Sequence, residues 1–586
     1  MNRRQFLTFN HASIDTSSGQ PYLENPQSTS QRNTSLTQKE LAARFLNQAT
    51  FGPTMAEIDA VEAIGFEAWI DQQIALPATE TLTYMWNVVE PVYALENQPL
   101  LHPAPFRWAW WQAVMRNPDT LRQRVGMALS EIMVISTRSD LLVDTAIGVA
   151  SFYDTLLKHA LGNFRNLLFD VAVHPAMGYY LSHANNRRAD PSINRFPDQN
   201  FAREVMQLFS IGLFELNQDG SRKKDVNGND IPTYDSDDVA EFAKVFTGMT
   251  FDPTPWGDDP NNENIFANNW LFWSNAANPM RMYEQFHEPG EKQLLNGFVV
   301  PSGQTGMQDI GDAIDNLFNH DNVGPFIGRL LIQRLVKSNP SPGYISRVAA
   351  AFNDNGSGVR GDMSAVVRAI LLDDEARNTG LINDPTHGML REPFVQYTHL
   401  CRALELYNLD GEDLFYNQVS NNMMESLGQY PFASPSVFNF FSPDYTPIGL
   451  LNDADLVGPE FQLATSVGVT QLHNFIEGRV WSDELMYMPK GLQGRPPING
   501  QGNEQRYPTV SDVRMNLTVY EEMNGDIDAL LARLNLLFAY GSLSEATLQT
   551  IENGLSDLYQ QQGQWGDIIR LAIILVVTCP EYLIMK

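Results

Sequence analysis

The spacing of hydrophobic residues along the chain predicts a protein built mainly from α-helices. Thr37 and Glu40 form a capping-box pattern, and hydrophobic residues follow it at helical spacing. Helical spacing recurs over residues 57–74, 106–115, 119–135, 154–161, 164–173, 312–318, 323–336, 344–352, 364–372 and 526–538. The sequence shows no internal repeat of fixed period, so we expect a large multi-helix fold with few short strands.

One segment in the middle of the chain, residues 251–309, departs from this pattern. It is rich in Asn, Pro, Gly and Trp and has weak periodicity, which is typical of a loop-rich insertion. Its tryptophans Trp256, Trp270 and Trp273 suit either a platform for stacking a sugar or a small core of the insertion itself, and the second is more common. We therefore divide the chain into a leader and disordered linker (1–35), an N-terminal helical region (36–250), the insertion (251–309), a second helical region (310–390) and a C-terminal helical region (391–586).

The leader carries an export-like motif. Residues 3–7 match the Arg-Arg-x-Phe-Leu pattern of twin-arginine signals, but residues 8–15 are not apolar enough for the hydrophobic region that such a signal needs. A degenerate signal, another export route and retention in the cell all stay open, and we expect a periplasmic or extracellular protein. No run of about 18 apolar residues occurs, so we expect no transmembrane helix. Residues 571–579 suggest a buried C-terminal helix instead.

Composition and charge narrow the class of protein. The chain has 586 residues, 43% of them hydrophobic, as expected for a folded protein. Its net charge of −30 repels nucleic acid and anionic lipid, so we expect neither as a partner. The two cysteines, Cys401 and Cys579, supply no disulfide framework and no zinc cluster, and whether they pair stays open.

The segment from residue 197 to 248 holds the main candidate site. Its first predicted helix, 197–212, has a packed face made of Phe201, Val205, Leu208 and Gly212. Polar residues occupy the other side: Asn200, Arg203, Glu204 and Gln207. Either this is an ordinary solvated face, or Glu204 is an acid–base group or metal ligand, with Arg203 binding an anion or holding Glu204 and Asn200 donating hydrogen bonds.

A second predicted helix, 236–246, has the same design. Its acidic residues Asp237 and Asp238 are well explained by capping together with Asp235, since carboxylates near a helix N-terminus are favourable. Upstream of the first helix, His174 and His183 are candidates for a base or metal ligands, and downstream of the second, His287 and Glu288 are candidates to complete a site with Glu204. A single histidine is more often a capping or packing residue.

The loop between the two helices allows two interpretations. Oxygen-bearing residues at alternate positions, Asp225, Asn227 and Asn229, resemble the start of a calcium loop, which would supply a divalent metal ion as cofactor. Position six of that loop is Asp230 instead of Gly, and position twelve is Ser236 instead of Glu. The alternative, a β-hairpin with a type I′ turn at Asn227-Gly228, is favoured by about two to one.

Several short motifs along the chain together resemble a known family. They are Ala42-Ala43-Arg44-Phe45-Leu46, Ala49-Thr50-Phe51-Gly52-Pro53, His174-Pro175-Ala176-Met177, Tyr180-Leu181-Ser182-His183, Asn200-Phe201-Ala202-Arg203-Glu204, Gln207-Leu208-Phe209-Ser210-Ile211-Gly212-Leu213, Leu216-Asn217-Gln218-Asp219-Gly220, Pro232-Thr233-Tyr234, Phe246-Thr247-Gly248, Arg391-Glu392-Pro393 and Pro435-Ser436-Val437-Phe438-Asn439-Phe440. This set resembles the bacterial domain of unknown function 1800 family, from Leu36 to the end of the chain. Gln199 and Glu288 depart from the Glu and Asp that relatives often carry there.

The resemblance implies an exported bacterial protein, often encoded beside a sulfatase-like protein, and it implies no activity. With the polar helix faces, it suggests a hydrolase that acts on an extracellular polymer such as a polysaccharide, with Glu204, Arg203, Asn200, His183 and His287 in its site. The alternative is a non-catalytic binding or assembly partner of the sulfatase-like neighbour. The sequence contains no His-Glu-x-x-His, Gly-x-Ser-x-Gly or Walker motif that would name another reaction.

Overall fold

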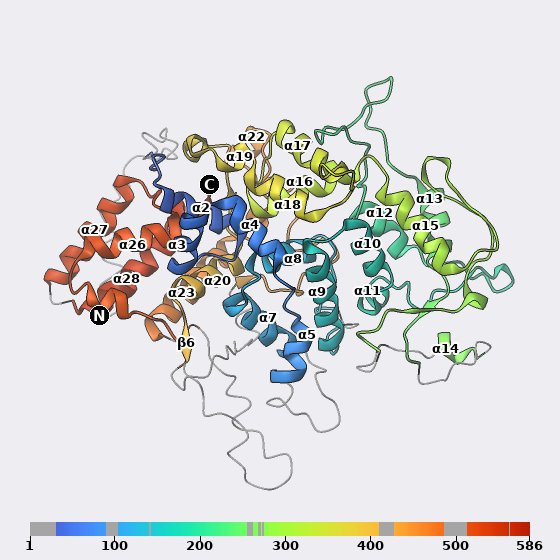
Figure 1. Ribbon diagram of the computed structural model, residues 1–586, viewed down its shortest axis with the longest axis horizontal. Helices are drawn as coiled ribbons and strands as arrows, with labels where there is room; N and C mark the ends of the chain where they lie inside the picture. The colour runs from blue at the N-terminus through green and yellow to red at the C-terminus, as the bar shows by residue number, and fades with distance from the viewer. Residues whose placement is uncertain are drawn as a thin grey trace, which may run out of the picture.

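The computed structural model of the chain confirms a mainly α-helical fold (Figure 1). The structure describes residues 31–89, 104–139, 142–254, 262–267, 271, 275–408, 427–483, 485, 513–561 and 563–586. In these ranges every strand is two residues long and pairs with one other strand in an antiparallel manner. None of the helices found there has the length and apolar character needed to cross a membrane.

The helices before the insertion begin with a reciprocal cap. The side chain of Thr37 accepts a hydrogen bond from the Glu40 N–H, and the Glu40 carboxylate accepts one from Thr37. A single helix over residues 57–74 is wrong, because Gly65 has φ 84° and divides it into two. The elements are α2 (Gln38–Ala49), α3 (Met55–Ile64), α4 (Phe66–Ala75), α5 (Thr81–Tyr84), η1 (Met85–Val89), α7 (Ala104–Arg116), α8 (Thr120–Ser130), α9 (Ala146–Ala160), α10 (Phe164–Ala172), α11 (Pro175–Tyr180), η2 (Pro191–Ile193), α12 (Asn200–Gln207), α13 (Ser236–Val245) and β1 (Met249–Thr250).

The insertion contains short strands and turns in its described parts, as its composition predicts. Residues Ile265, Phe266, Tyr283 and Phe286 form a small hydrophobic cluster of their own there. The tryptophans Trp256, Trp270 and Trp273 lie outside the described residues. The elements are α14 (Asn264–Ala267), β2 (Arg281–Met282), η3 (Glu284–Phe286), β3 (Lys292–Gln293), η4 (Leu295–Gly297), β4 (Val299–Val300) and α15 (Gly306–Phe318).

Helices follow from residue 323 to the C-terminus. The predicted C-terminal helix is present as α28, and Asp526 caps α26 as the sequence indicates. The elements are α16 (Val323–Leu335), α17 (Pro342–Asn353), α18 (Met363–Leu372), α19 (Asp374–Arg377), η5 (Thr379–Asn383), β5 (Met389–Leu390), α20 (Pro393–Ala403), β6 (Tyr407–Asn408), α22 (Leu450–Asp453), η6 (Pro459–Gln462), α23 (Ser466–Ser482), β7 (Val513–Arg514), α25 (Thr518–Glu522), α26 (Ile527–Ala539), α27 (Glu545–Gln560), α28 (Trp565–Thr578), α29 (Pro580–Leu583) and β8 (Ile584–Met585).

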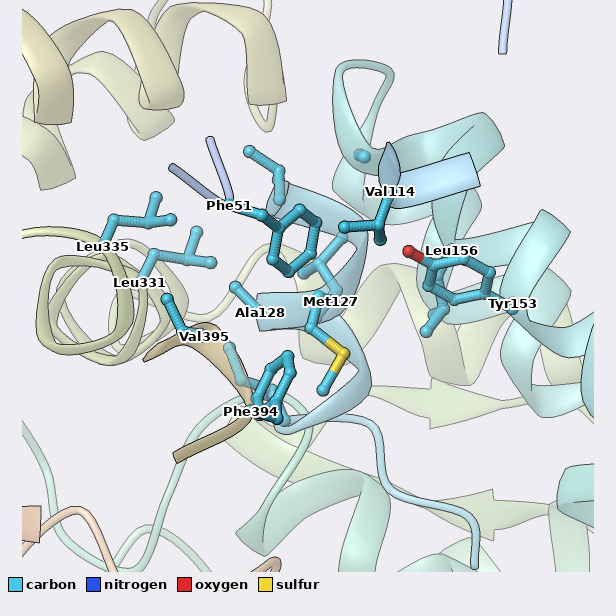
Figure 2. Close-up of a cluster of buried hydrophobic side chains, with 14 of the residues drawn as sticks. Phe51, Val114, Met127, Ala128, Tyr153, Leu156, Leu331, Leu335, Phe394 and Val395 are labelled. Carbon is cyan, nitrogen blue, oxygen red and sulfur yellow. The ribbon is translucent and has the colours of Figure 1, made fainter. Parts of the chain in front are cut away.

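Helices from distant parts of the chain share one hydrophobic core. Buried hydrophobic residues from Ala42 to Tyr582 form a continuous cluster, to which the three predicted helical regions all contribute. Figure 2 shows part of it, where Met127 and Ala128 of α8 lie near Leu331 of α16 and Phe394 of α20. Burial of this apolar surface is the main favourable term that holds these helices together.

The two ends of the described chain lie together. In Figure 1, α2 lies beside the C-terminal helix α26, and the two helices are in contact. Arg32 and Asn33 belong to the range assigned above to a leader and linker, yet both are docked, with Arg32 donating to Tyr540, Ser542 and Ile584. The docked chain therefore extends at least to Arg32.

Candidate functional site

The polar helix of the candidate site is shorter than the sequence indicates. It spans α12, Asn200–Gln207, and residues 208–212 form turns that end at Gly212 with φ 73°. A Cβ at Gly212 would lie 2.9 Å from the ring of Phe326, so both the backbone angle and the space favour glycine there. As predicted, Phe201 and Val205 are buried. This packing fixes the direction in which the polar side of the helix faces.

Glu204 does not lie on a solvated face. Its side chain is only 6% exposed, and its Oε2 atom is buried without a hydrogen-bond partner. Burial raises the pKa of Glu204 above its usual range, and the neighbouring charge of Arg203 partly opposes this rise. A carboxyl group that holds its proton more tightly than usual, beside a cation, has the electrostatic character of a general acid or base.

The immediate surroundings of Glu204 are polar and partly exposed. The hydroxyl group of Tyr234 lies 3.2 Å from Oε1 of Gln207, to which it donates. The pKa of Tyr234 is raised, first by burial and second by the nearby charge of Glu204, which places the phenol close to the carboxylate. Arg203 and Asn200 are exposed, and Asn200 donates to Oγ of Ser182 at 3.5 Å.

His183 packs against the same helix but does not present a free proton acceptor to solvent. Its ring stacks on Phe201 with centroids 3.9 Å apart, and Nε2 donates to the carbonyl of Ala172 at 2.8 Å. The Nδ1 atom is buried without a partner. Burial lowers the pKa of His183 to about 4, so the ring is neutral near pH 7.

His287 belongs to a buried ionic cluster. Its Nδ1 lies 2.9 Å from the carbonyl oxygen of Thr247, and its Nε2 lies 2.9 Å from Oδ2 of Asp309. Both ring nitrogens therefore have partners inside the protein, which fixes the orientation of the imidazole. The ammonium group of Lys292 contacts the same carboxylate oxygen and also donates to the carbonyls of Glu288 and Gly290.

The structure connects His183 and His287 only indirectly, through residues that pack on Phe201 of α12, the helix that also carries Glu204. Phe201 packs edge-to-face on Phe246 at 4.8 Å, and Thr247, which follows Phe246, holds His287. Across the described residues, no hydrogen bond or ion pair joins His287 to Glu204 or His183. Glu204 combines a buried carboxylate oxygen without a partner with a raised pKa, whereas His183 and His287 are held by packing and by hydrogen bonds to backbone carbonyls.

Sequence reasoning overlooked two members of this neighbourhood. Asp309 lies in the first turn of α15, 22 residues after His287, and Lys292 lies in β3, only five residues after it, but neither forms a recognisable motif with that histidine. Burial opposes ionisation of Asp309, but hydrogen bonds from His287 and Lys292 lower its pKa. Tyr234 belonged to a quoted motif, yet no pattern indicated its proximity to Glu204.

The capping explanation of the second helix is confirmed. The side chain of Asp235 accepts hydrogen bonds from the backbone N–H groups of Asp237 and Asp238. The side chain of Asp238 in turn accepts one from the backbone N–H of Asp235. Asp237 is exposed, as expected of a residue that complements the helix dipole.

The loop between the helices is a hairpin, and the expected type I′ turn is wrong. The N–H of Gly228 donates to the carbonyl of Asp225, and Gly228 alone in the turn has a positive φ, 85°. This is a turn with a glycine bulge. Both carboxylate oxygens of Asp225 accept hydrogen bonds from Asn227 or Asn229 within the turn.

Neither metal binding nor a closed pocket is indicated near these residues. The described part of the chain contains no group of three or more His, Cys, Asp or Glu arranged to hold a metal ion. An open depression of about 490 Å³ lies between α17 and α18, and none of the predicted site residues lines it. Its arginine Arg347 is paired with Asp373 at 2.6 Å. Cys401 and Cys579 are both free thiols.

A comparison of the sequence with known protein families tests the family resemblance that the motifs suggest. A family model described as "Protein of unknown function (DUF1800)" matches residues 44–584. The chain belongs to the DUF1800 family. No curated protein and no solved structure matches it significantly. The DUF1800 match therefore covers Glu204, its helix and the ionic cluster of His287, but it assigns no role to them.

Proposed function

We propose that this DUF1800 protein is an enzyme in which Glu204 transfers a proton, and that the reaction is hydrolysis of an extracellular polymer such as a polysaccharide. The observation that carries this proposal is a carboxyl group that is 6% exposed, has an unpartnered oxygen and a raised pKa, and lies among exposed polar groups. Structural carboxylates are normally paired when buried, whereas catalytic ones are held in the protonation state that they need.

The geometry suggests a separate role in catalysis or substrate binding for each of these residues. Glu204 in its protonated form would donate to the leaving oxygen as the bond to the polymer breaks, and the resulting carboxylate would then activate water. Arg203 would stabilise that carboxylate. Because the Tyr234 hydroxyl donates to Oε1 of Gln207, the amide Nε2 of Gln207 is directed elsewhere and suits a substrate oxygen.

The proposal is tested by assaying release of reducing ends from a panel of polysaccharides with the native protein and two variants. Glu204→Gln keeps the size of the side chain and removes its proton chemistry, so activity should fall by about 10²–10⁴-fold. Asp237→Asn changes an exposed acid on the neighbouring helix and should retain activity. Equal activity of the two variants would show that Glu204 does not take part in catalysis. Absence of hydrolysis by the native protein would contradict the proposed hydrolase activity.

A second function, as an assembly partner of a sulfatase-like protein encoded beside it, has one favourable observation. Helix α23 exposes Val467, Val469 and Trp481, at 63%, 50% and 40%. Exposed apolar side chains on one helix suit a protein contact. Co-purification of the genomic neighbour that is lost in a Val467→Asp variant would support this role, and retention of the neighbour would count against this surface.

A further inference from the structure

A second buried polar network lies at the junction of four distant segments. Glu131 directly follows α8, Arg334 lies on α16, Glu392 directly precedes α20, and Gln429 lies near the start of the segment 427–483. Their side chains are between 0% and 4% exposed. The network adjoins the hydrophobic cluster of Figure 2, in which Leu335 and Phe394 are chain neighbours of its members.

One amide group of this network serves two carboxyl groups. The Nε2 atom of Gln429 lies 3.2 Å from Oε1 of Glu131 and 2.5 Å from Oε2 of Glu392. The second oxygen of each carboxyl group, Oε2 of Glu131 and Oε1 of Glu392, is buried and makes no hydrogen bond. Both acids thus face the same nitrogen and each has an oxygen without a partner.

The nearby arginines do not fill these two positions. Arg334 donates through its two Nη atoms to the carbonyls of Leu330 and Glu131, and its Nε lies 3.4 Å from Oε2 of Glu131 without the alignment of a hydrogen bond. Arg124 donates to the carbonyl of Arg334 and lies 4.0 Å from Oε1 of Glu392. Two fully ionised carboxylates would be poorly solvated here, which is costly in a protein interior.

We propose that Glu131 and Glu392 share one proton, and that this proton makes the junction of α8, α16, α20 and the segment from Leu427 sensitive to rising pH. A proton on one carboxyl group donates to an oxygen of the other, which replaces the second buried negative charge with a hydrogen bond and leaves a single negative charge near Arg124 and Arg334. Two carboxyl groups held close together in a protein characteristically behave in this way, because both cannot ionise without repulsion.

The charged groups that face the pair set the direction of the response. They are Arg124 on α8, Arg334 on α16 and Glu460 on η6. Burial and the charge of Glu392 raise the pKa of Glu131, and the two arginines oppose them. Glu460 is also buried, and burial raises its pKa to about 8. A raised pKa in the folded state stabilises the protein at low pH, and this stabilisation is lost as pH rises through the folded value.

The test compares thermal unfolding and infrared spectra as pH rises, in a Glu460→Gln background that removes the other raised-pKa acid facing the pair. Burial also raises the pKa of Asp154 and Glu204, but their bands are common to every protein compared and cancel in difference spectra. The difference between the starting protein and Glu131→Gln or Glu392→Gln should contain the C=O stretch of a protonated carboxylic acid. Each variant should also lose less stability as pH rises, because the amide supplies the hydrogen permanently.

A matched control is Glu375→Gln, which changes a carboxylate that is ionised in its contact with Lys337 and has a lowered pKa. It should leave the loss of stability with rising pH unchanged. Absence of a carboxylic acid band from the difference spectrum between the Glu460→Gln protein and its Glu131→Gln variant would overturn the proposal. Equal destabilisation of Glu131→Gln at every pH would overturn it as well, since that is the result expected for an ionised Glu131 paired with Arg334.

Discussion

The Nε2 atom of His287 lies 2.9 Å from Oδ2 of Asp309, and both side chains are only 2% exposed. Lys292, 1% exposed, contacts the same oxygen. Replacing Asp309 with Ala would leave the Lys292 ammonium and the His287 ring buried without their carboxylate partner. We expect Asp309→Ala to lower the free energy of unfolding by about 3–5 kcal/mol, measured by chemical denaturation.

The control for this variant lies on the same helix. Asp315 forms a two-point ion pair with Arg165 at 2.7 and 3.1 Å, but its side chain is 50% exposed. Asp315→Ala should lower the free energy of unfolding by about 1 kcal/mol or less, because exposed ion pairs are screened by water. If the two variants were equally destabilised, burial would not be what makes the cluster of Asp309 important.

Acid should destabilise the protein through His183. Its pKa falls from 6.5 to about 4 on burial, so the unfolded chain binds a proton over that interval while the folded protein does not. Stability should therefore decrease as pH falls from about 6.5 to about 4, by at most about 3 kcal/mol from this group. Unfolding temperatures of native protein and His183→Gln across this range check the assignment, and the variant should show the weaker dependence on pH.

The elements that the sequence predicts well are those whose determinants are local. Asp235, Val239 and Phe242 specify the cap and the packed face of α13 within a few residues, and the structure has both. The break between α3 and α4 was missed because the hydrophobic spacing continues across Gly65. Only the backbone angle of that glycine, φ 84°, ends the first helix.

The first docked residue makes contacts that can be removed one side chain at a time. Arg32 donates to the Ile584 carbonyl and the Tyr540 hydroxyl, both at 3.1 Å, and to Oγ of Ser542 at 2.5 Å. Arg32→Ala should lower the free energy of unfolding by about 1.5–3 kcal/mol, the range for hydrogen bonds to a charged donor. Arg222→Ala, at a half-exposed hairpin residue paired with Asp230, should change it far less. Hydrogen exchange of the C-terminal backbone amides, compared between native protein and Arg32→Ala, would show whether Arg32 stabilises the C-terminal end of the chain.

The candidate site could be predicted from sequence only in part. Polar residues at helical spacing indicated Glu204, but the same pattern fits a solvated face, and only the fold shows that Glu204 is buried. Asp309, the carboxylate partner of His287, is 22 residues away along the chain. No spacing rule connects them, since the contact depends on how α15 packs against the loop that carries His287.

The charge beside Glu204 gives the last prediction. Arg203 lowers the pKa of Glu204 against the larger effect of burial. Arg203→Gln should therefore raise that pKa further and move the Glu204-dependent step of the activity profile to higher pH, whereas a purely structural Arg203 would change stability without moving the step. The sign for stability follows: a raised pKa is stabilising at low pH, so Arg203→Gln should lose more stability than native protein as pH rises through the Glu204 titration. Carboxyl NMR signals of Glu204, assigned with Glu204→Gln, measure the pKa directly, and an unchanged value in Arg203→Gln would contradict the coupling.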